Sequence, residues 1–533
     1  MLTAVLCPPT MADLQKELAC FAQCAPQKFD NAHDTHKQHD AHETCTMQDK
    51  HLYEALELRL DFCNDVTPAR FPPLPLPTII TLRSQKHGGV FQGTEEERIT
   101  LMKELMASLK PAYLDVEDSV PTSIMSELHE LSPKTTLIIS HHDFTRTPDL
   151  DTLLAAMQQV FPPKPRVLYK IACQANSTLD ALTMLQFCRR HHKKLHTMGS
   201  GLVGISMGSF GETTRILAPV IHHGICYCPT STTTAPGQID AATLTDIYNT
   251  PALTPKTALY GLLGDPVDQS QGHIFHNRRN KQGSVNAVYV KWQVTKDELP
   301  KALELLYDIG VRGLSLTMPL KETGAALCQT PVGSPYQAIN TLRSKVTSPK
   351  AHDGGMALSP VPTTPLSGNS SDASPQKQRS NHSITMHWEG CNTDGEGALR
   401  SLHRPVYQKK VIVIGAGGAS LALLIALQEN GAVPLVYNRS AKPLPYNTPI
   451  RPLEELIDTP LPSHDIIINT LPFTLSFPFE RIQFSKKALA FDISYAQPSP
   501  FLAAAQKVGC ELLTGQGMFE EQALLQRAFW GLL

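Results

Sequence analysis

Lys170 stands in the apolar run VLYKIAC, where a buried lysine amine could attack a ketone. Desolvation disfavours the ammonium form, and the imine that a neutral amine makes acidifies the neighbouring C–H bond. His142, in the run TLIISHHDF, could remove that proton and later return it to a departing hydroxyl group. The pair predicts Schiff-base elimination of water, against the alternative that Lys170 only extends its stem along apolar surface.

A second set of residues forms the glycine-rich loop Gly415-Ala416-Gly417-Gly418-Ala419, which follows the run KKVIVI and precedes a helical pattern. Glycines let the backbone approach a pyrophosphate, and the helix N-terminus offers free N–H groups to it. Ser420 replaces the third glycine of the usual fingerprint. The strand–loop–helix context favours a dinucleotide site over a tight turn without a ligand.

About twenty residues further on, by the spacing usual for this fold, Asn438-Arg439-Ser440 end the next apolar run. NAD enzymes usually carry Asp or Glu at this point to hold the ribose 2′-hydroxyl. An arginine without a carboxylate suits a 2′-phosphate instead. The predicted cofactor is therefore NADP.

The composition sets the frame for these sites. The chain has 533 residues, 41% hydrophobic and 18% charged, with a net charge of −2, which favours neither nucleic acid nor an anionic membrane as partner. No apolar run is long enough for a spanning helix, and the first residues do not resemble a signal peptide. The twelve cysteines form no CxxC pair, so we expect reduced thiols, a cytoplasmic protein and no metal site.

Eight short apolar runs between Leu2 and Pro229 alternate with helical patterns such as Glu95–Leu109, Leu150–Phe161 and Thr178–Arg190. Eight β/α units of this size predict a (β/α)8 TIM barrel, which keeps its chemistry at the carboxyl ends of the strands. Polar or sulfur-containing residues stand at or just past those ends: Glu57, Arg59, Arg83, Glu117, His142, Lys170, Met207 and Gln238.

Three segments interrupt the pattern. Residues 24–50 carry His33, His36, His39 and His42 at even spacing, and the segment is polar and poor in aliphatics, which indicates a solvated loop. The alternative is a metal site, but the histidine spacing matches no zinc motif. Residues 250–257 are a proline-containing linker. Residues 343–386 are rich in Ser, Pro and Thr and poor in aliphatics, so we expect a disordered insertion within a hairpin formed by AINTLRS and SITMHWEG.

Residues 258–533 resemble shikimate dehydrogenases through an ordered series: YGLLGDPVDQSQGHIFHN, GLSLTMPLKE, AINTL, NTDGEGAL, the GAGGA loop, NRS, INTLP, DISY and GQGMFEEQALLQ. The resemblance implies that Lys321 and Asp394 act together at the carbon that receives hydride, as a pair able to relay a proton to the developing alkoxide. The alternative is a surface lysine and a helix-capping aspartate. It also implies substrate contacts from Ser270, Gly272, Thr317, Asn340, Tyr495 and Gln522, and cofactor contacts from Ile493 and Gly515.

Two positions depart from that family's pattern. Gly272 replaces the second serine of the SxSP motif, and Ser315 replaces the usual asparagine before the TxPxK threonine. The first change removes a contact to the substrate carboxylate and opens space. Because quinate carries one more hydroxyl group than shikimate, quinate stays open as an alternative substrate.

Residues 1–240 resemble type I 3-dehydroquinate dehydratases through ELRLD, ITLRS, LDVE, SHHDF, YKIA, ISMGSFGETTR and TAPGQI. The resemblance implies Lys170 as the imine-forming lysine and His142 as the general acid and base. Substrate-binding residues would be Glu57, Arg59, Arg83, Arg215, Thr234 and Gln238, with Arg215 as the partner of the carboxylate. Relatives place a glutamate at the position of His87 to orient the catalytic histidine, so that role passes to Glu117 or to no residue.

Together these observations predict a bifunctional fusion of the α/β class. A barrel over 1–249 is followed by a linker, a substrate-binding domain over 258–397, and a Rossmann-type NADP-binding domain over 398–533 whose last helix returns to the substrate-binding domain. The expected reactions convert 3-dehydroquinate to 3-dehydroshikimate and then, with NADPH, to shikimate. Alternatives are a C-terminal half that prefers quinate, or one half that is a non-catalytic metabolite or NADP sensor; the oligomeric state stays open.

Overall fold

The computed structural model describes residues 1–23, 52–222, 224–230, 237–329, 338–345, 387–472, 475–494 and 499–533. The histidine-rich segment 24–50, Thr234, Tyr495 and residues 346–386 of the expected insertion lie outside the described residues. The chain divides into two compact units. The first comprises Met1–Ala258 with Asn277–Gln293, and the second comprises Leu259–His276 with Val294–Leu533.

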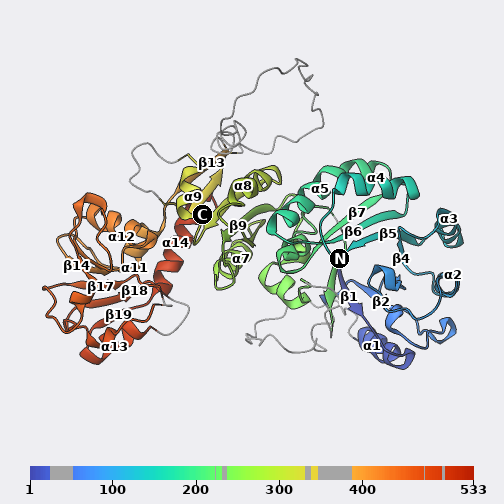
Figure 1. Ribbon diagram of the computed structural model, residues 1–533. Helices are drawn as coiled ribbons and strands as arrows, with labels where there is room; N and C mark the ends of the chain where they lie inside the picture. Colours follow the sequence, from blue (N-terminus) through green and yellow to red (C-terminus); the bar gives the residue numbers. More distant parts are fainter. Residues whose placement is uncertain are drawn as a thin grey trace, which may run out of the picture. The chain divides into compact units, whose positions relative to one another are not determined.

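The first unit contains an eight-stranded parallel sheet in the order β7-β6-β5-β4-β3-β2-β1-β8. Neighbouring strands β4 to β7 can be followed in Figure 1. The strands are β1 (Leu2–Leu6), β2 (Ala55–Arg59), β3 (Thr78–Thr81), β4 (Tyr113–Glu117), β5 (Thr136–Asp143), β6 (Val167–Gln174), β7 (Gly201–Met207) and β8 (Cys226–Pro229). All eight predicted strands are confirmed, in the sequential order of a (β/α)8 barrel. Ladders between described residues leave β7 and β8 as the two ends of this curled sheet.

Helices follow the strands of this unit: α1 (Met11–Gln23), α2 (Glu95–Leu109), α3 (Thr122–Leu131), α4 (Leu150–Val160), α5 (Thr178–Thr197) and α6 (Glu212–Ile216). Local sequence explains their starts. Thr94 and Glu97 form a reciprocal capping box at the first turn of α2, and the Asp149 side chain caps α4. The three helices predicted from periodicity are therefore present, with α5 extending to Thr197.

The inner face of the curled sheet is partly apolar and partly charged. Its apolar part contains Val5, Ile79, Ile138, Ala172, Val203, Ile205, Met207, Ile225 and Tyr227, all buried in one cluster. Because side chains alternate along a strand, the register places charged residues on the same face. Ser140 pairs with both Glu117 and Lys170, and Thr81 pairs with both Arg59 and Asp115.

The second unit contains two sheets. Strands β9 (Ala258–Gly264), β11 (Val311–Leu316), β12 (Thr341–Ser344) and β13 (Trp388–Cys391) lie side by side in this order. Between β9 and β12 the chain also forms helices α7 (Gly272–Gln282), α8 (Leu299–Asp308) and α9 (Lys321–Ala326), and strand β10 (Ala287–Gln293). The predicted hairpin is confirmed, because β12 and β13 pair antiparallel with Ser344 opposite Trp388.

The other sheet has six strands in the order β16-β15-β14-β17-β18-β19, and neighbouring strands pair parallel throughout its described residues. Its strands are β14 (Lys410–Ile414), β15 (Val433–Asn438), β16 (Ile450–Pro452), β17 (Ile466–Asn469), β18 (Leu489–Asp492) and β19 (Glu511–Leu513). Helices α11 (Asp394–Ser401), α12 (Gly418–Glu429), α13 (Pro500–Val508) and α14 (Gly515–Trp530) accompany them. The order, with the strand order reversing at β14, is that of the predicted Rossmann-type fold.

Helix α14 returns to the first sheet of this unit, as expected. Trp530 Nε1 donates a hydrogen bond to the Leu342 carbonyl oxygen at 2.9 Å, and Arg343 donates to the Phe529 carbonyl oxygen. The indole ring also fills the space above Gly313, where an added Cβ would meet it at 2.4 Å. These contacts fix the end of the chain against β11 and β12.

Three boundaries differ from the expectations. Arg343 and Ser344 belong to β12, so the strand extends into the range predicted as an insertion. Residues 250–257, expected as a linker after the barrel, fall within the first unit, with Thr250 and Thr257 buried. Asn277–Gln293 groups with the first unit, because packing and not chain order defines a compact unit. No helix among the described residues is long and apolar enough to cross a membrane.

Candidate active sites

Lys170 lies in β6 on the inner face of the sheet, with its side chain 5% exposed. Its Nζ is 2.9 Å from Asp115 Oδ2 and 3.9 Å from Glu57 Oε1, and it lies 4.3 Å from the ring centroid of Tyr227. Lys170 is buried, as predicted, but the prediction of apolar surroundings is wrong. The outward residues of β6 are buried and largely apolar, whereas the inward lysine meets two carboxylates and an aromatic face.

Asp115 is a central residue of this site that sequence reasoning missed. Burial alone would raise the pKa of Asp115, but the Lys170 ammonium and the Arg83 guanidinium outweigh it, so that the pKa is lowered. Its other oxygen accepts a hydrogen bond from Ser140 Oγ at 2.6 Å. The signal was present, since Asp115 stands two residues before Glu117 in LDVE and strand alternation puts both on one face.

The predicted arginines are buried or nearly so. Arg83 NH2 is 3.9 Å from Asp115 Oδ2. Arg59 makes a bidentate pair with Asp61, at 2.9 and 2.7 Å, which fixes its guanidinium plane. Arg215 is 4% exposed in α6, and burial lowers its pKa. Arg59 is therefore oriented by the fold before any substrate binds.

His142 lies on the same inner face as Lys170, because it is two residues beyond Ser140, the register partner of Lys170. Neither ring nitrogen of His142 has a hydrogen-bond partner among the described residues. Burial, followed by the charges of Arg83 and Lys170, holds the pKa of His142 well below its usual value. His142 is therefore neutral near pH 7 and able to accept a proton.

The residues next to His142 determine how its ring is oriented. Glu117 accepts hydrogen bonds from Arg98 and from the Ser84 backbone N–H, at 2.6 and 2.7 Å, and so is committed elsewhere. The ring of His87 meets that of His142 edge to face at 6.3 Å, and Phe144 stacks on it at 6.1 Å. Aromatic packing, rather than a carboxylate, holds the His142 ring. His141 contacts Asp118 instead, at 2.8 Å.

The remaining predicted residues of this site are Glu57, Gln238 and Thr234. Glu57 is 4% exposed and accepts a hydrogen bond from Thr81 Oγ1 at 2.9 Å. Gln238 is half-buried just beyond β8. Thr234 lies outside the described residues, so its predicted role stays a prediction.

In the second unit, Lys321 and Asp394 meet as predicted. Lys321 Nζ is 2.6 Å from Asp394 Oδ2, with side chains 19% and 5% exposed. Lys321 opens α9 and Asp394 opens α11. A partly exposed ammonium beside a buried carboxylate is a geometry suited to proton transfer at the mouth of a site.

Asn340 organises the residues around this pair. Its Nδ2 donates to Asp394 Oδ1 at 2.8 Å, to Thr393 Oγ1 at 3.0 Å and to Gln522 Oε1 at 3.2 Å. Its Oδ1 accepts from the Thr393 backbone N–H at 2.9 Å. Three predicted residues, Asn340, Asp394 and Gln522, are thus brought together from β12, α11 and α14.

The other predicted substrate residues are less tightly held. Thr317 follows β11 and is half-buried, and Ser270 Oγ accepts a hydrogen bond from the Gly272 N–H at 3.2 Å. Ser315, which departs from the family pattern, is buried and donates to Gln526 Oε1 at 3.0 Å. That bond supports the packing of α14 on β11. Tyr495 lies outside the described residues.

The glycine-rich loop has the form that a dinucleotide needs. Gly415 adopts a φ of +101°, and an added Cβ there would meet Thr470 Oγ1 at 2.6 Å, so only glycine fits. A Cβ at Gly417 or Gly418 would meet nothing within 4 Å, which leaves open space at the N-terminus of α12. Ala416 and Ala419 complete the turn. Ser420 Oγ donates to the Gly415 carbonyl at 2.8 Å, which explains how serine replaces the third glycine.

The residues after β15 are exposed. Asn438 Nδ2 donates to the Ser440 carbonyl at 3.0 Å, which shapes the turn, while Arg439 is exposed within it. Lys442, which sequence reasoning missed, donates to the Ala416 carbonyl of the glycine-rich loop. A second cation three residues after Arg439 was the available signal. Gly515 begins α14 where a Cβ would meet the Ile493 carbonyl at 2.1 Å, so these two residues, both predicted to contact the cofactor, are adjacent.

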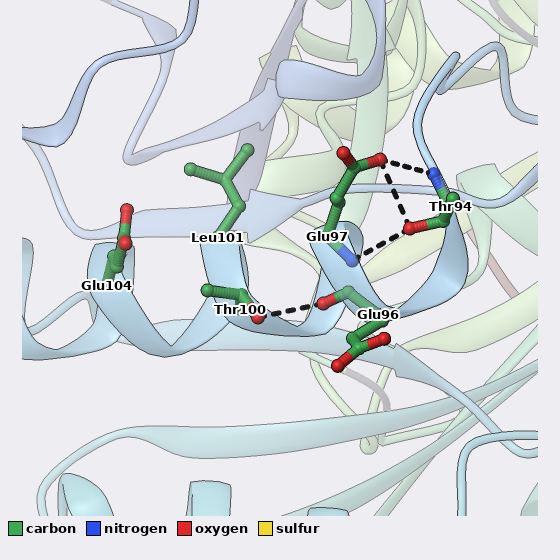
Figure 2. A pocket seen from close by; sticks show the side chains of 6 residues that line it. All are labelled: Thr94, Glu96, Glu97, Thr100, Leu101 and Glu104. Atoms are coloured by element: carbon green, nitrogen blue, oxygen red, sulfur yellow. Dashed lines mark hydrogen bonds between the residues drawn. The ribbon is translucent and has the colours of Figure 1, made fainter.

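Other features of the described residues do not compete with these sites. Figure 2 shows a pocket over the first turns of α2, lined by Thr94, Glu96, Glu97, Thr100, Leu101 and Glu104. Its polar atoms serve the helix, since Glu97 accepts from the Thr94 backbone N–H at 2.7 Å. No group of three or more His, Cys, Asp or Glu side chains with metal-binding geometry occurs in the part of the chain that the structure describes.

Comparison with known proteins gives two family matches. Residues 35–254 match the model of type I 3-dehydroquinase, and residues 262–342 match that of the shikimate dehydrogenase substrate binding domain. The shikimate biosynthesis protein AroDE of Chlamydia pneumoniae is 30% identical over 508 residues, which cover 90% of each chain. A chloroplastic bifunctional 3-dehydroquinate dehydratase/shikimate dehydrogenase of Arabidopsis thaliana is 28% identical, covering 89% of this chain and 77% of its own.

Among solved structures, the dehydroquinate dehydratase and shikimate dehydrogenase part of S. pombe AroM covers 99% of this chain and 95% of its own, at 19% identity and a TM-score of 0.36. A shikimate dehydrogenase of Aquifex aeolicus covers 52% of this chain and 94% of its own, at 25% identity and a TM-score of 0.39.

Proposed function

The chain belongs to the family of bifunctional 3-dehydroquinate dehydratase/shikimate dehydrogenases, and from this premise we propose which of its residues carry each reaction. It converts 3-dehydroquinate to 3-dehydroshikimate, and 3-dehydroshikimate to shikimate, in the shikimate pathway. The first reaction belongs to the first unit and the second reaction to the second unit. The alternatives, a quinate-preferring half or a non-catalytic sensor, are not favoured by relatives that are named for both activities.

In the dehydratase site, Lys170 is the residue that forms an imine with the substrate ketone. After its ammonium loses a proton to solvent, Nζ attacks the ketone carbon. The ketone oxygen takes one proton from the attacking nitrogen and one from solvent and departs as water, which leaves an iminium. Neutral His142 then removes a proton from the neighbouring carbon, and the electron pair forms an enamine. The protonated His142 returns this proton to the β-hydroxyl group, which leaves as water, and hydrolysis of the imine frees Lys170.

Asp115 and Glu57 keep the Lys170 nitrogen in place during this cycle. Their carboxylates lie 2.9 and 3.9 Å from Nζ, and a positive nitrogen is present both in the free ammonium and in the iminium intermediate. Arg215 binds the substrate carboxylate, and Arg59, Arg83, Thr234 and Gln238 hold substrate oxygens. Buried cations and amides of this kind recognise a polyhydroxylated keto acid through oriented hydrogen bonds.

In the dehydrogenase site, Lys321 and Asp394 supply the proton that ketone reduction needs. A hydride from NADPH reduces the carbonyl carbon when the cofactor is bound. Lys321 donates a proton to the carbonyl oxygen, and Asp394, 2.6 Å away, holds the ammonium that does so. Ser270, Thr317, Asn340, Tyr495 and Gln522 orient the substrate, with the Asn340 network fixing Asp394. Gly272, which has no side chain, donates its N–H to Ser270 Oγ at 3.2 Å.

We propose NADP as the cofactor. The open space at Gly417 and Gly418 admits a pyrophosphate at the start of α12, and Gly415, Ala416 and Ala419 shape that turn. Asn438, Arg439 and Ser440 form the turn that receives the 2′-phosphate, with Arg439 exposed in it and Lys442 close by. Ile493 and Gly515 line the neighbouring edge. The substrate-binding and NADP-binding domains over 258–397 and 398–533 remain part of this proposal.

The observation that carries the dehydratase assignment is the buried Lys170 on the same face as a neutral His142. The test is borohydride reduction in the presence of 3-dehydroquinate, followed by peptide mapping with mass spectrometry. We expect one reduced adduct, at Lys170, and none in Lys170→Ala.

The matched control is Lys164→Ala. Lys164 Nζ also lies 4.3 Å from an aromatic ring, that of Phe161, but outside the site. The control should keep the adduct at Lys170. An adduct at another lysine, or none in the wild type, would refute the assignment.

A further inference from the structure

Tyr227 is an aromatic residue that lies beside the proposed imine nitrogen. It lies in β8, 4% exposed, in the apolar cluster of the inner face. Lys170 Nζ lies 4.3 Å from its ring centroid. A phenol hydroxyl is only one bond from its ring, so the hydroxyl of Tyr227 also lies near the atom that attacks the substrate.

That hydroxyl is buried and has no hydrogen-bond partner among the described residues. A buried hydroxyl without a partner costs free energy, and such groups in native proteins usually serve a ligand or a bound water. Thr3, the register partner of Tyr227 in β1, also has a buried hydroxyl without a described partner. Polar donors thus face the interior where the substrate must approach Lys170.

Two other buried tyrosines of this unit show how an ordinary structural hydroxyl behaves. The Tyr169 hydroxyl, in β6 beside Lys170, donates to the Phe161 carbonyl at 2.5 Å. The Tyr53 hydroxyl donates to the Pro229 carbonyl at 3.4 Å. Tyr227 differs from both, although it is just as buried. Its hydroxyl is available to a ligand and theirs are not.

We propose that Tyr227 is a further catalytic residue of the dehydratase, whose hydroxyl donates a hydrogen bond to the substrate ketone oxygen while Lys170 attacks the adjoining carbon. When the N–C bond forms, the electron pair of the C=O π bond moves to that oxygen, and a donor there stabilises the developing charge. The oxygen later leaves as water. No bond to Tyr227 forms or breaks, and the inference rests on the proposed role of Lys170.

The electrostatic surroundings keep the hydroxyl in its donor form. Burial, with the Glu57 and Asp115 carboxylates, raises the pKa of Tyr227 well above its usual value. The phenol therefore retains its proton throughout the working pH range.

The test compares Tyr227→Phe with the matched control Tyr169→Phe in the full chain. For each protein, the rate of imine formation is measured by mixing with 3-dehydroquinate, quenching with borohydride at set times and quantifying the Lys170 adduct. Steady-state kcat/KM and the thermal midpoint are measured in parallel. Tyr227→Phe should slow adduct formation and lower kcat/KM by about 10- to 100-fold, as for other lost hydrogen bonds to developing charge.

The thermal midpoints of the two variants should show the opposite pattern to their rates. Tyr227→Phe removes an unpartnered buried hydroxyl and should unfold at the wild-type temperature or above it, whereas Tyr169→Phe loses a made hydrogen bond and should unfold earlier with wild-type rates. If Tyr227→Phe forms the adduct at the wild-type rate, the hydroxyl only binds water and the proposal is wrong. If the wild type gives no adduct at Lys170, the role of Lys170 itself fails instead.

Discussion

Lys321 Nζ lies 2.6 Å from Asp394 Oδ2, although the two residues are 73 positions apart in the chain. Each stands at the first residue of a helix, α9 or α11, so the pair depends on two helix starts meeting at one point. Asn340 holds the other carboxylate oxygen at 2.8 Å. The carboxylate is thereby fixed from both sides, while the ammonium remains partly exposed.

Replacing Lys321 tests whether this pair moves the proton. Lys321→Met should lower kcat for reduction of 3-dehydroshikimate by about 100- to 10,000-fold, the range typical of lost general acid–base catalysis. The KM for NADPH should change little, because Lys321 lies outside the glycine-rich loop. Dehydratase activity of the same preparation serves as the folding control. A variant that kept wild-type kcat would show that Lys321 only binds or packs.

Replacing Arg439 tests the cofactor. Charged hydrogen bonds contribute roughly 1.5–3 kcal/mol each, so Arg439→Ala should raise the KM for NADPH by about 10- to 100-fold. NADH lacks the 2′-phosphate, and its KM should scarcely change. Lys442→Ala makes a useful comparison, because Lys442 contacts the Ala416 carbonyl of the glycine-rich loop. The Lys442→Ala variant should bind both NADPH and NADH more weakly. Equal use of NADH by the wild type would contradict the charge-pairing account.

His276 should make the second unit sensitive to acid. Burial, with the Arg527 guanidinium, lowers the pKa of His276 to about 3, whereas an unfolded histidine titrates near 6.5. Between these values the unfolded chain binds a proton that the folded chain does not. Above about pH 6.5, His276 therefore does not lower the free energy of unfolding of this unit. As pH falls below that value, the free energy of unfolding decreases by up to about 1.4 kcal/mol per pH unit.

The midpoint of urea unfolding is measured at pH 7.5 and at pH 5. Tryptophan fluorescence is the signal, because the Trp530 ring lies 5.3 Å from that of His276. His276→Gln cannot titrate and should show a smaller loss between the two pH values than the wild type. The same loss in both proteins would assign the acid sensitivity to other groups.

The insertion should be dispensable for both reactions. Strands β12 and β13 pair antiparallel up to Ser344 and Trp388, so a short glycine-containing turn in place of residues 346–386 can close the hairpin. Both activities should remain within about twofold of the wild type, since loop exchange at a hairpin tip leaves packed residues unchanged. Loss of dehydrogenase activity in a folded variant would mean that the segment does more than connect.

Sequence patterns predicted the strands well because each strand buries an apolar run between turn signals, as in LTAVL and DIIINTLP. Motifs also predicted the Lys321–Asp394 pair. Strand alternation in LDVE could have pointed to Asp115 as a site residue. No motif, however, predicted that Asp115 and Tyr227 would lie beside Lys170, because both come from strands distant in the chain. Nor could motifs predict that Ser315 would bond to Gln526, 211 residues away. Such contacts depend on register and packing, which local spacing does not encode.

The most direct measurement is to give the purified protein 3-dehydroquinate with and without NADPH and to identify the products by mass spectrometry. Without NADPH, 3-dehydroshikimate should accumulate. With NADPH, it should be consumed, with one shikimate formed for each NADPH oxidised. Lys170→Ala should block both products from 3-dehydroquinate yet still reduce added 3-dehydroshikimate. Formation of quinate directly from 3-dehydroquinate, or a reaction that stops at 3-dehydroshikimate with NADPH unused, would contradict the assignment of two consecutive activities.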